Sequence, residues 1–400
     1  MASILSAGTT NSTALNLTAD TSGSLILASN NGTTAVTVDT DQNATFANTS
    51  TFTGSVNAPN TFGFKNRIIN GGMVIDQRNA GATVTINSAA WTYIVDRFCA
   101  LGQATDGVYT AQQSSTAPAG FTKSLLVTVT TADASVGAGQ IYTLRQTIEG
   151  YNIADLNWGT ANAKSCTLSF WVRSSVTGTF SGCINNEGTA SYPFTYTINA
   201  ANTFEYKTVT LDGPTSGTWG STNSNGIRLT WSLGTGSTYS GTANTWNYST
   251  EYFAASSTTN LIATNGATWY ITGVQLETGI KATSFDYRDF SRELVLCQRY
   301  FCSSFNIGVA PAYNAGGGMI GKGANGATAE PIICWQFPVS MRTAPTVTTY
   351  NPNASNNQWT TGTTPRMVTN TTAMTSVDNT GNPITSGTQS YIHLSATAEL

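Results

Sequence analysis

Few side chains in this chain have the chemistry that catalysis needs. There is one histidine, His393, in the segment Tyr391–Ser395 near the C-terminal end. Nucleophilic triads depend on a base beside the nucleophile, and zinc sites are built from clusters of His and Cys. The six cysteines contain no CxxC pair. The sequence therefore predicts neither a triad nor a metal or cofactor site. We expect His393 to point outward on a strand, or to lie in a contact between copies of the chain, without a catalytic role.

Paired carboxylates are harder to judge, because two acids that hydrolyse a glycoside need only be close in space. The candidates in the central part of the chain are Glu149, Glu187, Glu205, Glu251 and Glu277. Glu149 and Glu277 lie next to glycines at the ends of expected strands. We expect them to form structural ion pairs with Arg145, Arg173 or Arg228, and we predict that the protein is not an enzyme.

Aromatic residues on polar loops suggest a different chemistry. A sugar offers apolar C–H faces and many hydroxyl groups, so its site combines aromatic rings with amide and hydroxyl groups. The loop aromatics that fit are Trp359, Tyr313, Trp246, Tyr248, Tyr239 and Trp219. Trp359 is the first choice because polar residues surround it on both sides. Each of these rings has an alternative role in a core or a subunit contact, and Trp171 and Trp231, in the middle of strands, are expected in the core.

The composition restricts the partners. Only 9% of the 400 residues are charged, with 17 basic and 20 acidic side chains. This balance gives no basic surface for a phosphate backbone, so we expect no nucleic acid partner. No run of 18 apolar residues predicts membrane insertion, and the first residues lack the features of a secretory signal. A polar, weakly ionic surface with 10% aromatics favours an ordered β-rich extracellular or virion protein.

The cysteines at 99, 166, 183, 297, 302 and 334 are too sparse for a disulfide scaffold. Cys166 and Cys183 alternate in phase with apolar neighbours, which favours buried free thiols. A Cys166–Cys183 bridge remains an alternative.

Residues 1–60 predict very short strands at Leu15–Thr18, Ser24–Leu27, Ala35–Val38 and Thr45–Ala47, separated by turn residues. Strands this short bury little surface by themselves, so we expect several copies of the chain to associate here. The glycines and proline in Thr53–Phe64 are typical of a linker.

Residues 61–285 alternate between apolar and polar side chains in segments separated by turns, which predicts a jelly-roll β-sandwich. Two strands are expected around Asn70–Gly72 within Lys65–Arg78, and a short helical turn in Tyr151–Trp158. The remaining strands are expected at Trp91–Phe98, Ser124–Thr130, Gly139–Glu149, Ala163–Ser174, Gly178–Asn185, Tyr192–Ile198, Glu205–Leu211, Gly226–Leu233 and Trp269–Leu276.

Residues 286–301 contain the main helical pattern. Phe290, Leu294, Cys297 and Phe301 fall on one face of a helix that Asp289 or Ser291 can cap. This helix is expected to connect the jelly roll to a smaller C-terminal β-sandwich at 302–400. The strands expected there are Cys302–Val309, Pro331–Phe337, Pro345–Thr349, Arg366–Thr369 and Tyr391–Ala396, with long loops at Pro311–Gly326, Asn351–Thr364 and Asn370–Gly387.

Several segments in fixed order resemble a domain common in bacteriophage tail fibre and prophage proteins. They are Asn66–Arg78 with Asp96–Phe98, Ser169–Ser174, Val274–Gly279, Glu293–Tyr300, Phe337–Arg342 with Ala344–Val347, and Ser395–Leu400. Residues 15–50 are similar to the threonine-rich N-terminal segments of the same proteins. The resemblance implies a homotrimeric adhesin of the virion whose jelly roll is similar to carbohydrate-binding modules.

The expected function is therefore that of a non-catalytic tail fibre or receptor-binding protein that attaches to a host surface polysaccharide. Residues 1–60 would join the fibre to tail or baseplate proteins and align the trimer, and 302–400 would form the receptor-binding tip. Two alternatives stay open: a structural fibre or decoration protein of the virion without a receptor, and a tail fibre that degrades polysaccharide.

Overall fold

The computed structural model describes residues 24–29, 33–40, 44–46, 64–102, 106–323, 332–380 and 385–400. The chain divides into two compact units, Met1–Pro59 and Asn60–Leu400. In the first unit, β1 (Leu25–Ser29), β2 (Thr33–Val38) and β3 (Ala44–Phe46) form a three-stranded antiparallel sheet. Ile26, Leu27 and Phe46 are about half exposed on it, so the described strands of this unit enclose no buried core. The predicted strand at Leu15–Thr18 and residues 53–63 of the predicted linker lie outside the described residues.

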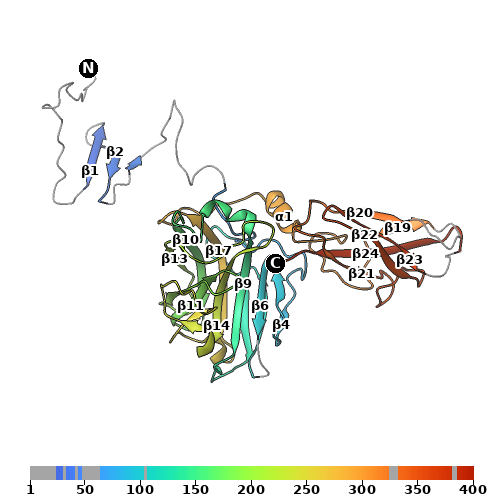
Figure 1. Cartoon of the computed structure of the whole chain (residues 1–400), viewed down its shortest axis with the longest axis horizontal. Coiled ribbons are helices and arrows are strands. Elements are labelled where there is room, and N and C mark those ends of the chain that lie inside the picture. Colours follow the sequence, from blue (N-terminus) through green and yellow to red (C-terminus); the bar gives the residue numbers. More distant parts are fainter. Residues whose placement is uncertain are drawn as a thin grey trace, which may run out of the picture. The chain divides into compact units, whose positions relative to one another are not determined.

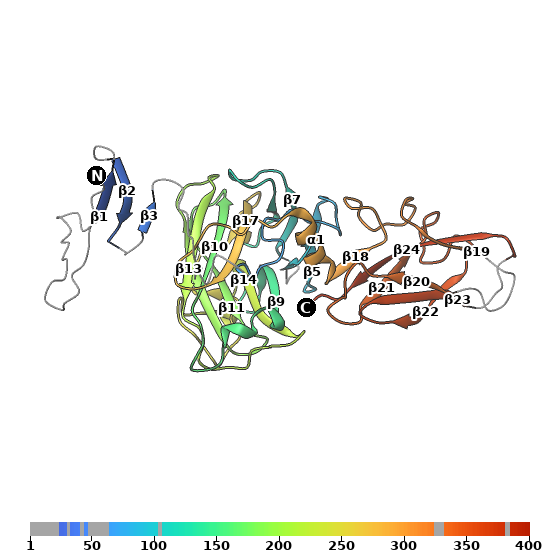
Figure 2. The same ribbon diagram turned by 90° about the horizontal axis from the view of Figure 1, so that it is seen from above.

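The second unit begins with two six-stranded antiparallel sheets that pack face to face as a β-sandwich (Figures 1 and 2). The first sheet has the order β13 (Glu205–Leu211), β10 (Cys166–Ser174), β17 (Thr268–Thr278), β8 (Ser124–Thr131), β7 (Val108–Ser114), β4 (Val84–Ile86). The second has the order β12 (Ser191–Ile198), β11 (Gly178–Asn185), β14 (Asn225–Thr235), β9 (Ile141–Glu149), β6 (Phe98–Gly102), β5 (Thr92–Val95). The predicted all-β jelly-roll class is confirmed.

Alternation of side chains between the two faces of each strand builds the core between the sheets. In β10, Cys166, Leu168, Phe170 and Val172 point inward and are completely buried. Ser169, Trp171 and the other residues between them therefore lie on the outer face. The predicted strands from Ser124 to Leu276 all coincide with observed strands. Short pieces complete the sandwich: β15 (Ser240–Gly241), β16 (Ala254–Ala255), and the 3-10 turns η1 (Gly150–Asn152), η2 (Ala154–Leu156), η3 (Ser237–Tyr239) and η4 (Leu261–Ala263). The first two of these turns confirm the helical turn predicted in Tyr151–Trp158.

The prediction of two strands within Lys65–Arg78 is wrong. Asn70 and Met73 have positive φ angles of 60° and 58°, which a continuous strand does not allow. The segment instead crosses the edge of β17 as buried coil. The side chain of Asn66 donates to the carbonyl of Val274 at 3.1 Å and accepts from the amide of Leu276 at 3.2 Å.

Helix α1 (Phe290–Gln298) begins where predicted, and the Asp289 carboxylate caps it by accepting from the amide of Arg292 at 3.0 Å. Cys297 is buried against Ile69 and Ile75, with Leu294 half-buried beside them, so the helix packs on the Asn66–Arg78 segment. The predicted apolar face is correct at Leu294 and Cys297. It is wrong at Phe290, which is 52% exposed.

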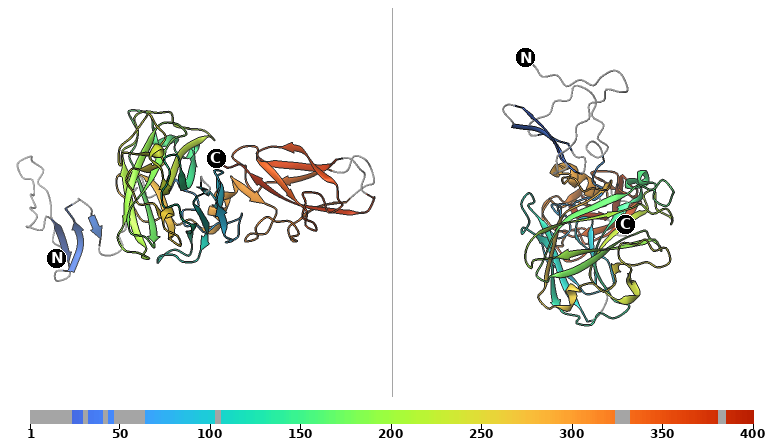
Figure 3. Two further views of the ribbon diagram at one scale, coloured as in Figure 1. Left: turned by 90° about the horizontal axis from the view of Figure 1, so that it is seen from below. Right: turned by 90° about the vertical axis from the view of Figure 1, so that its left-hand side faces the viewer.

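The C-terminal strands form a group of their own, orange and red in Figure 3. One sheet contains β18 (Phe301–Ser303), β24 (Gln389–Thr397), β19 (Ile320–Gly323) and β21 (Thr346–Tyr350), and the other contains β20 (Ile333–Gln336), β23 (Met374–Thr380) and β22 (Thr364–Asn370). Trp359, Val377, Ile392 and Leu394 fill the space between them. The prediction of a loop over Asn370–Gly387 is wrong, since β23 lies inside it. The proposed boundaries of this part and of the connecting helix remain predictions.

All six cysteines are free thiols, and all except Cys334 are buried. The alternative of a Cys166–Cys183 bridge is therefore wrong. Among the helices in the described part of the chain, none is long and apolar enough to cross a membrane.

Candidate functional site

The candidate site is a cleft on the outer face of the first sheet, at strands β13, β10 and β17. Its volume is about 560 Å³. The loop between β17 and α1 closes one side of it. The cleft is lined by small, hydroxyl and aromatic side chains: Ala119, Phe121, Ser169, Trp171, Tyr206, Gly273, Ala282, Thr283, Ser284, Phe285 and Tyr287.

One wall of this cleft comes from the sheet itself. Trp171 on β10 and Tyr206 on β13 are directly paired across the two strands. Their ring centroids lie 5.4 Å apart with the rings tilted by 50°. Both side chains point outward because their neighbours in sequence, Phe170 and Val172 on one strand, face the core. Tyr206 is 43% exposed and Trp171 is half-buried, so both rings present a face to solvent.

The other wall is an aromatic triad. Phe121 is the last residue of a turn, in which its amide donates to the carbonyl of Pro118. It packs against Phe285 and Tyr287 of the β17–α1 loop, at centroid distances of 5.0 Å and 5.6 Å. Phe285 and Tyr287 are themselves 5.0 Å apart, edge to face. Edge-to-face contacts of this kind fix the orientation of aromatic rings, so this wall has a defined shape.

The floor between the two walls is Gly273. It has a φ of +63° and lies at a β-bulge, where the register of β10 and β17 shifts between Ser169 and Trp171. A Cβ on this glycine would lie 2.7 Å from the ring of Phe121 and 3.0 Å from the ring of Trp171. Both walls therefore reach the backbone of β17 only because this position has no side chain.

Two buried side chains of β17 hold the loop that carries Phe285 and Tyr287. Gln275 accepts from the amide of Asp286 at 2.8 Å. The Glu277 carboxylate accepts from the amide of Thr283 at 2.8 Å, from the Thr283 hydroxyl at 2.6 Å and from the side-chain amide of Gln275 at 2.8 Å. Gln275 and Glu277 are fully buried. Because these bonds are internal, the aromatic wall is already in place without a ligand.

Several polar groups in the cleft are unused. The hydroxyl of Ser169, the indole N–H of Trp171 and the phenol groups of Tyr206 and Tyr287 form no hydrogen bond with any residue that the structure describes. Ser169 is also 98% buried by its neighbours, and it lines the cleft. These groups are free to form hydrogen bonds with the hydroxyl groups of a ligand that enters the cleft.

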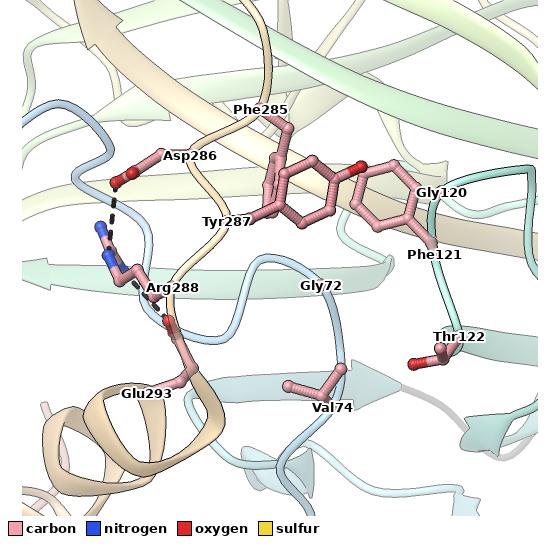
Figure 4. A pocket seen from close by; sticks show the side chains of 10 residues that line it. All are labelled: Gly72, Val74, Gly120, Phe121, Thr122, Phe285, Asp286, Tyr287, Arg288 and Glu293. Carbon is pink, nitrogen blue, oxygen red and sulfur yellow. Dashed lines mark hydrogen bonds and ion pairs between the residues drawn. The ribbon is translucent and has the colours of Figure 1, made fainter. Parts of the chain in front are cut away.

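A smaller hollow of about 180 Å³ shares Phe121, Phe285 and Tyr287 with the cleft (Figure 4). Arg288 lies between Asp286 and Glu293 there, at 3.4 Å from a carboxylate oxygen of each. The same guanidinium donates to the carbonyls of Ile68 and Asn66. The charges in this hollow therefore hold the loop and helix α1 to the coil before β4.

Three of the predicted binding residues do come together, at another corner of the sandwich. Trp219 and Trp246 lie 5.7 Å apart, both edge to face with Trp158, and Tyr248 stacks on Trp246. The indole N–H of Trp246 donates to the carbonyl of Asp212 at 2.8 Å, and that of Trp219 to the carbonyl of Ser216 at 3.3 Å. The first bond joins two loops and the second closes one of them, which is a structural use of the rings.

The leading prediction, Trp359, is corrected. Its ring is 0% exposed, its N–H donates to the carbonyl of Asp378, and it packs in the C-terminal core beneath Lys322. No face of it is open to a sugar. Tyr313 is 38% exposed and donates to Asn357, while Tyr239 packs on Phe253 away from the other candidates.

The predicted carboxylates are all engaged by other side chains or backbone groups. Glu149 accepts from Arg299 and Tyr300; although burial raises its pKa, these hydrogen bonds outweigh that effect and lower it. Arg228 pairs with Glu187 and Glu251. The predicted pairing of Glu149 and Glu277 with Arg145, Arg173 or Arg228 is wrong, because Glu149 pairs with Arg299 and Glu277 bonds to Gln275 and Thr283. Glu205 accepts from Lys207 and Asn199, and these bonds outweigh burial and lower its pKa to about 2. Among the described residues, no group of three or more His, Cys, Asp or Glu side chains could hold a metal ion.

The sequence analysis missed the cleft residues and placed Trp171 in the core, which is wrong. The signal was present in the alternation of β10: with Phe170 and Val172 inward, Trp171 must point outward. The same alternation in β13 places Tyr206 outward, since Val209 and Leu211 are buried. The pairing of Phe121 with the β17–α1 loop has no counterpart in local sequence, because more than 160 residues separate them.

No protein-family model matches the chain, and no curated protein is similar to it in sequence. Among solved structures, the chain is similar to the enzymatically active domain of tailspike protein 4 from bacteriophage CBA120, with 15% identity over 54% of this chain and a TM-score of 0.28. This chain covers 21% of that protein. The chain is also similar to the module TmCBM61 in complex with β-1,4-galactotriose, with 10% identity and a TM-score of 0.27. This match covers 54% of this chain and 99% of that module. A family 11 carbohydrate-binding module of a Clostridium thermocellum cellulase is similar with 8% identity and a TM-score of 0.25. The match covers 49% of this chain and 99% of that module.

Proposed function

We propose that this protein binds a carbohydrate in the cleft between Trp171 and Phe121 and does not cleave it. The observation that supports the proposal is that one cleft combines two aromatic walls, a glycine floor, and hydroxyl and N–H groups that form no hydrogen bond within the described part of the protein. A pyranose ring presents apolar C–H faces to the walls and hydroxyl groups to Ser169 and Tyr206. An apolar surface with a few convergent polar groups is the usual form of a small-ligand site.

We further propose that the protein is a bacteriophage tail fibre component of the virion that uses this site to attach to a host surface glycan. The resemblance of its ordered segments to such fibres supports this role. A homotrimer would multiply the affinity of a single weak site, because several copies bind one surface together. In this proposal the Met1–Pro59 unit joins the fibre to tail or baseplate proteins. The exposed apolar side chains Ile26, Leu27 and Phe46 support an association there.

The proposal moves the first candidate for receptor contact from the C-terminal strands to the jelly roll. Trp359 is closed off, whereas the cleft is open and preformed. The C-terminal part stays a predicted second region of contact, through the half-exposed Tyr313.

The proposal is tested with the 400-residue chain by affinity electrophoresis. Affinity electrophoresis through gels containing a panel of bacterial and plant polysaccharides should show retardation by at least one polymer, with no release of reducing ends from it. Retardation by none of the polymers, together with no adsorption to bacterial cell envelopes, would contradict carbohydrate binding. Release of reducing ends would contradict the non-catalytic role.

A further inference from the structure

The charges around the cleft indicate which class of glycan it takes. None of the eleven lining residues has a side chain that is charged at neutral pH. Acidic sugars such as uronic acids carry a carboxylate that is strongly hydrated, and proteins that bind a carboxylate usually offer it an arginine fork or a lysine. The lining of this cleft offers neither.

Several cations on the elements around the cleft are already used by the protein. Lys65 donates to the carbonyl of Ser284, on the loop that closes the cleft. Arg288 is held by two carboxylates and two carbonyls, as described above. On the sheet side, Lys207 is paired with Glu205 at 2.6 Å, and Arg173 donates to the carbonyl of Asn202 while it packs on the ring of Tyr270. Lys281, next to Ala282 on the loop, is not free either.

A buried acid, Glu277, lies behind the loop that lines the cleft. Glu277 is fully buried, takes part in no described salt bridge, and bonds to Thr283, which lines the cleft. Its charge is balanced by hydrogen bonds alone among the described contacts. A second carboxylate brought into the cleft by a ligand would lose its water, gain no cation and face this negative charge.

We infer that the cleft binds uncharged glycans and discriminates against acidic ones. This inference rests on the proposed function, because it names the class of ligand for the same site. The hydroxyl groups of a neutral sugar match the four unused polar groups, and its C–H faces match the aromatic walls. Binding of this kind depends little on ionic strength, because salt screens only charge–charge attraction.

The experiment compares the full-length chain in gels that contain neutral polymers (galactomannan, xyloglucan, mixed-linkage β-glucan, amylose) or acidic polymers (polygalacturonate, alginate, hyaluronate). Each gel is run at about 50 mM and about 500 mM salt, conditions that span strong differences in screening. We expect retardation only by neutral polymers, unchanged within about twofold between the two salt concentrations, and lost in Trp171→Ala.

Three results would overturn the inference in different ways. Retardation by acidic polymers that is lost in Trp171→Ala would leave the proposed site intact and refute its restriction to uncharged glycans. Retardation by neither class would refute the proposed function together with the inference. Retardation by neutral polymers that falls strongly with salt would also contradict the inference, since binding would then depend on charge–charge attraction.

Discussion

Gly273 of β17 lies directly against the ring of Phe121, which belongs to the connection between β7 and β8. The contact leaves no room for a Cβ on residue 273. We therefore expect Gly273→Ala to displace Phe121 and Trp171 and to weaken glycan binding at least tenfold, about 1.4 kcal/mol. It should also destabilise the fold by more than the about 1–2 kcal/mol that a non-glycine residue costs at positive φ. Titration of the glycan and denaturant unfolding measure the two effects.

Gly266 provides the matched control. It has a φ of +76°, but a Cβ there would meet no atom within 4 Å. Gly266→Ala should carry the backbone cost alone and leave binding unchanged. Equal losses of stability in the two variants, with binding intact in both, would show that Gly273 is not the floor of a ligand site.

A second prediction concerns the attachment of the C-terminal strands to the jelly roll. The Glu399 carboxylate pairs with Arg97 and Arg78, and Arg97 is 2% exposed. Glu399→Gln leaves the buried Arg97 guanidinium without its carboxylate, while Arg78 keeps Asp96 at 3.8 Å. We therefore expect a loss of about 3–5 kcal/mol in the free energy of unfolding. Denaturant unfolding measures it.

Glu187→Gln is the control for this pair, because Glu187 is 61% exposed in its contact with Arg228. An exposed pair contributes about 0–1 kcal/mol. A similar small loss for Glu399→Gln would mean that the C-terminal residues are held mainly by apolar contacts.

A third prediction follows from His393, which is fully buried and not outward-facing as expected from the sequence, and which stacks on Phe305 at 4.0 Å. Its Nε2–H donates to the carbonyl of Ala315 at 3.0 Å, so Nδ1 accepts from the Ser304 hydroxyl at 3.0 Å, and the ring is neutral. Burial lowers the pKa of His393 below its usual 6.5. The unfolded chain therefore takes up this proton first as the pH falls below 6.5, and the stability contributed by the neutral ring is progressively lost there.

The Tm of the wild-type protein should thus fall more steeply between about pH 7 and about pH 5 than that of His393→Gln, which has no ring to protonate. Burial raises the pKa of Asp96 to about 6, which acts in the opposite direction, but equally in both proteins. Parallel pH profiles for the two proteins would contradict the assignment of a neutral, structural histidine.

Much of the fold was predictable because its signals are local. The alternation in Cys166–Ser174 and Glu205–Leu211 located the strands, and Asp289 located the start of α1. The failures have physical causes outside the local pattern. Positive φ angles at Asn70 and Met73 convert an apparent hairpin into buried coil, and β23 lies in a hydroxyl-rich segment whose strand character comes from pairing with β20 and β22.

The candidate site was less predictable for the same reason. Aromatic rings on polar loops were expected to be exposed, yet the polar neighbours of Trp359 surround a ring that fills a core between two sheets. Trp171 was expected inside because it is large and lies in mid-strand, although the phase of β10 directs it outward. The opposite wall depends on a contact between Phe121 and a loop far away in sequence, and local patterns carry no information about such a contact.

The central claim is that the cleft at Trp171, and not the tryptophan cluster at Trp246, binds the glycan. Isothermal titration of the full-length wild-type chain, Trp171→Ala and Trp246→Ala with a retarding polysaccharide tests it most directly. We predict at least tenfold weaker binding, about 1.4 kcal/mol, for Trp171→Ala, and unchanged affinity with a lower Tm for Trp246→Ala. Unchanged affinity in a folded Trp171→Ala, with binding lost in Trp246→Ala, would contradict the account and place the site at the tryptophan cluster.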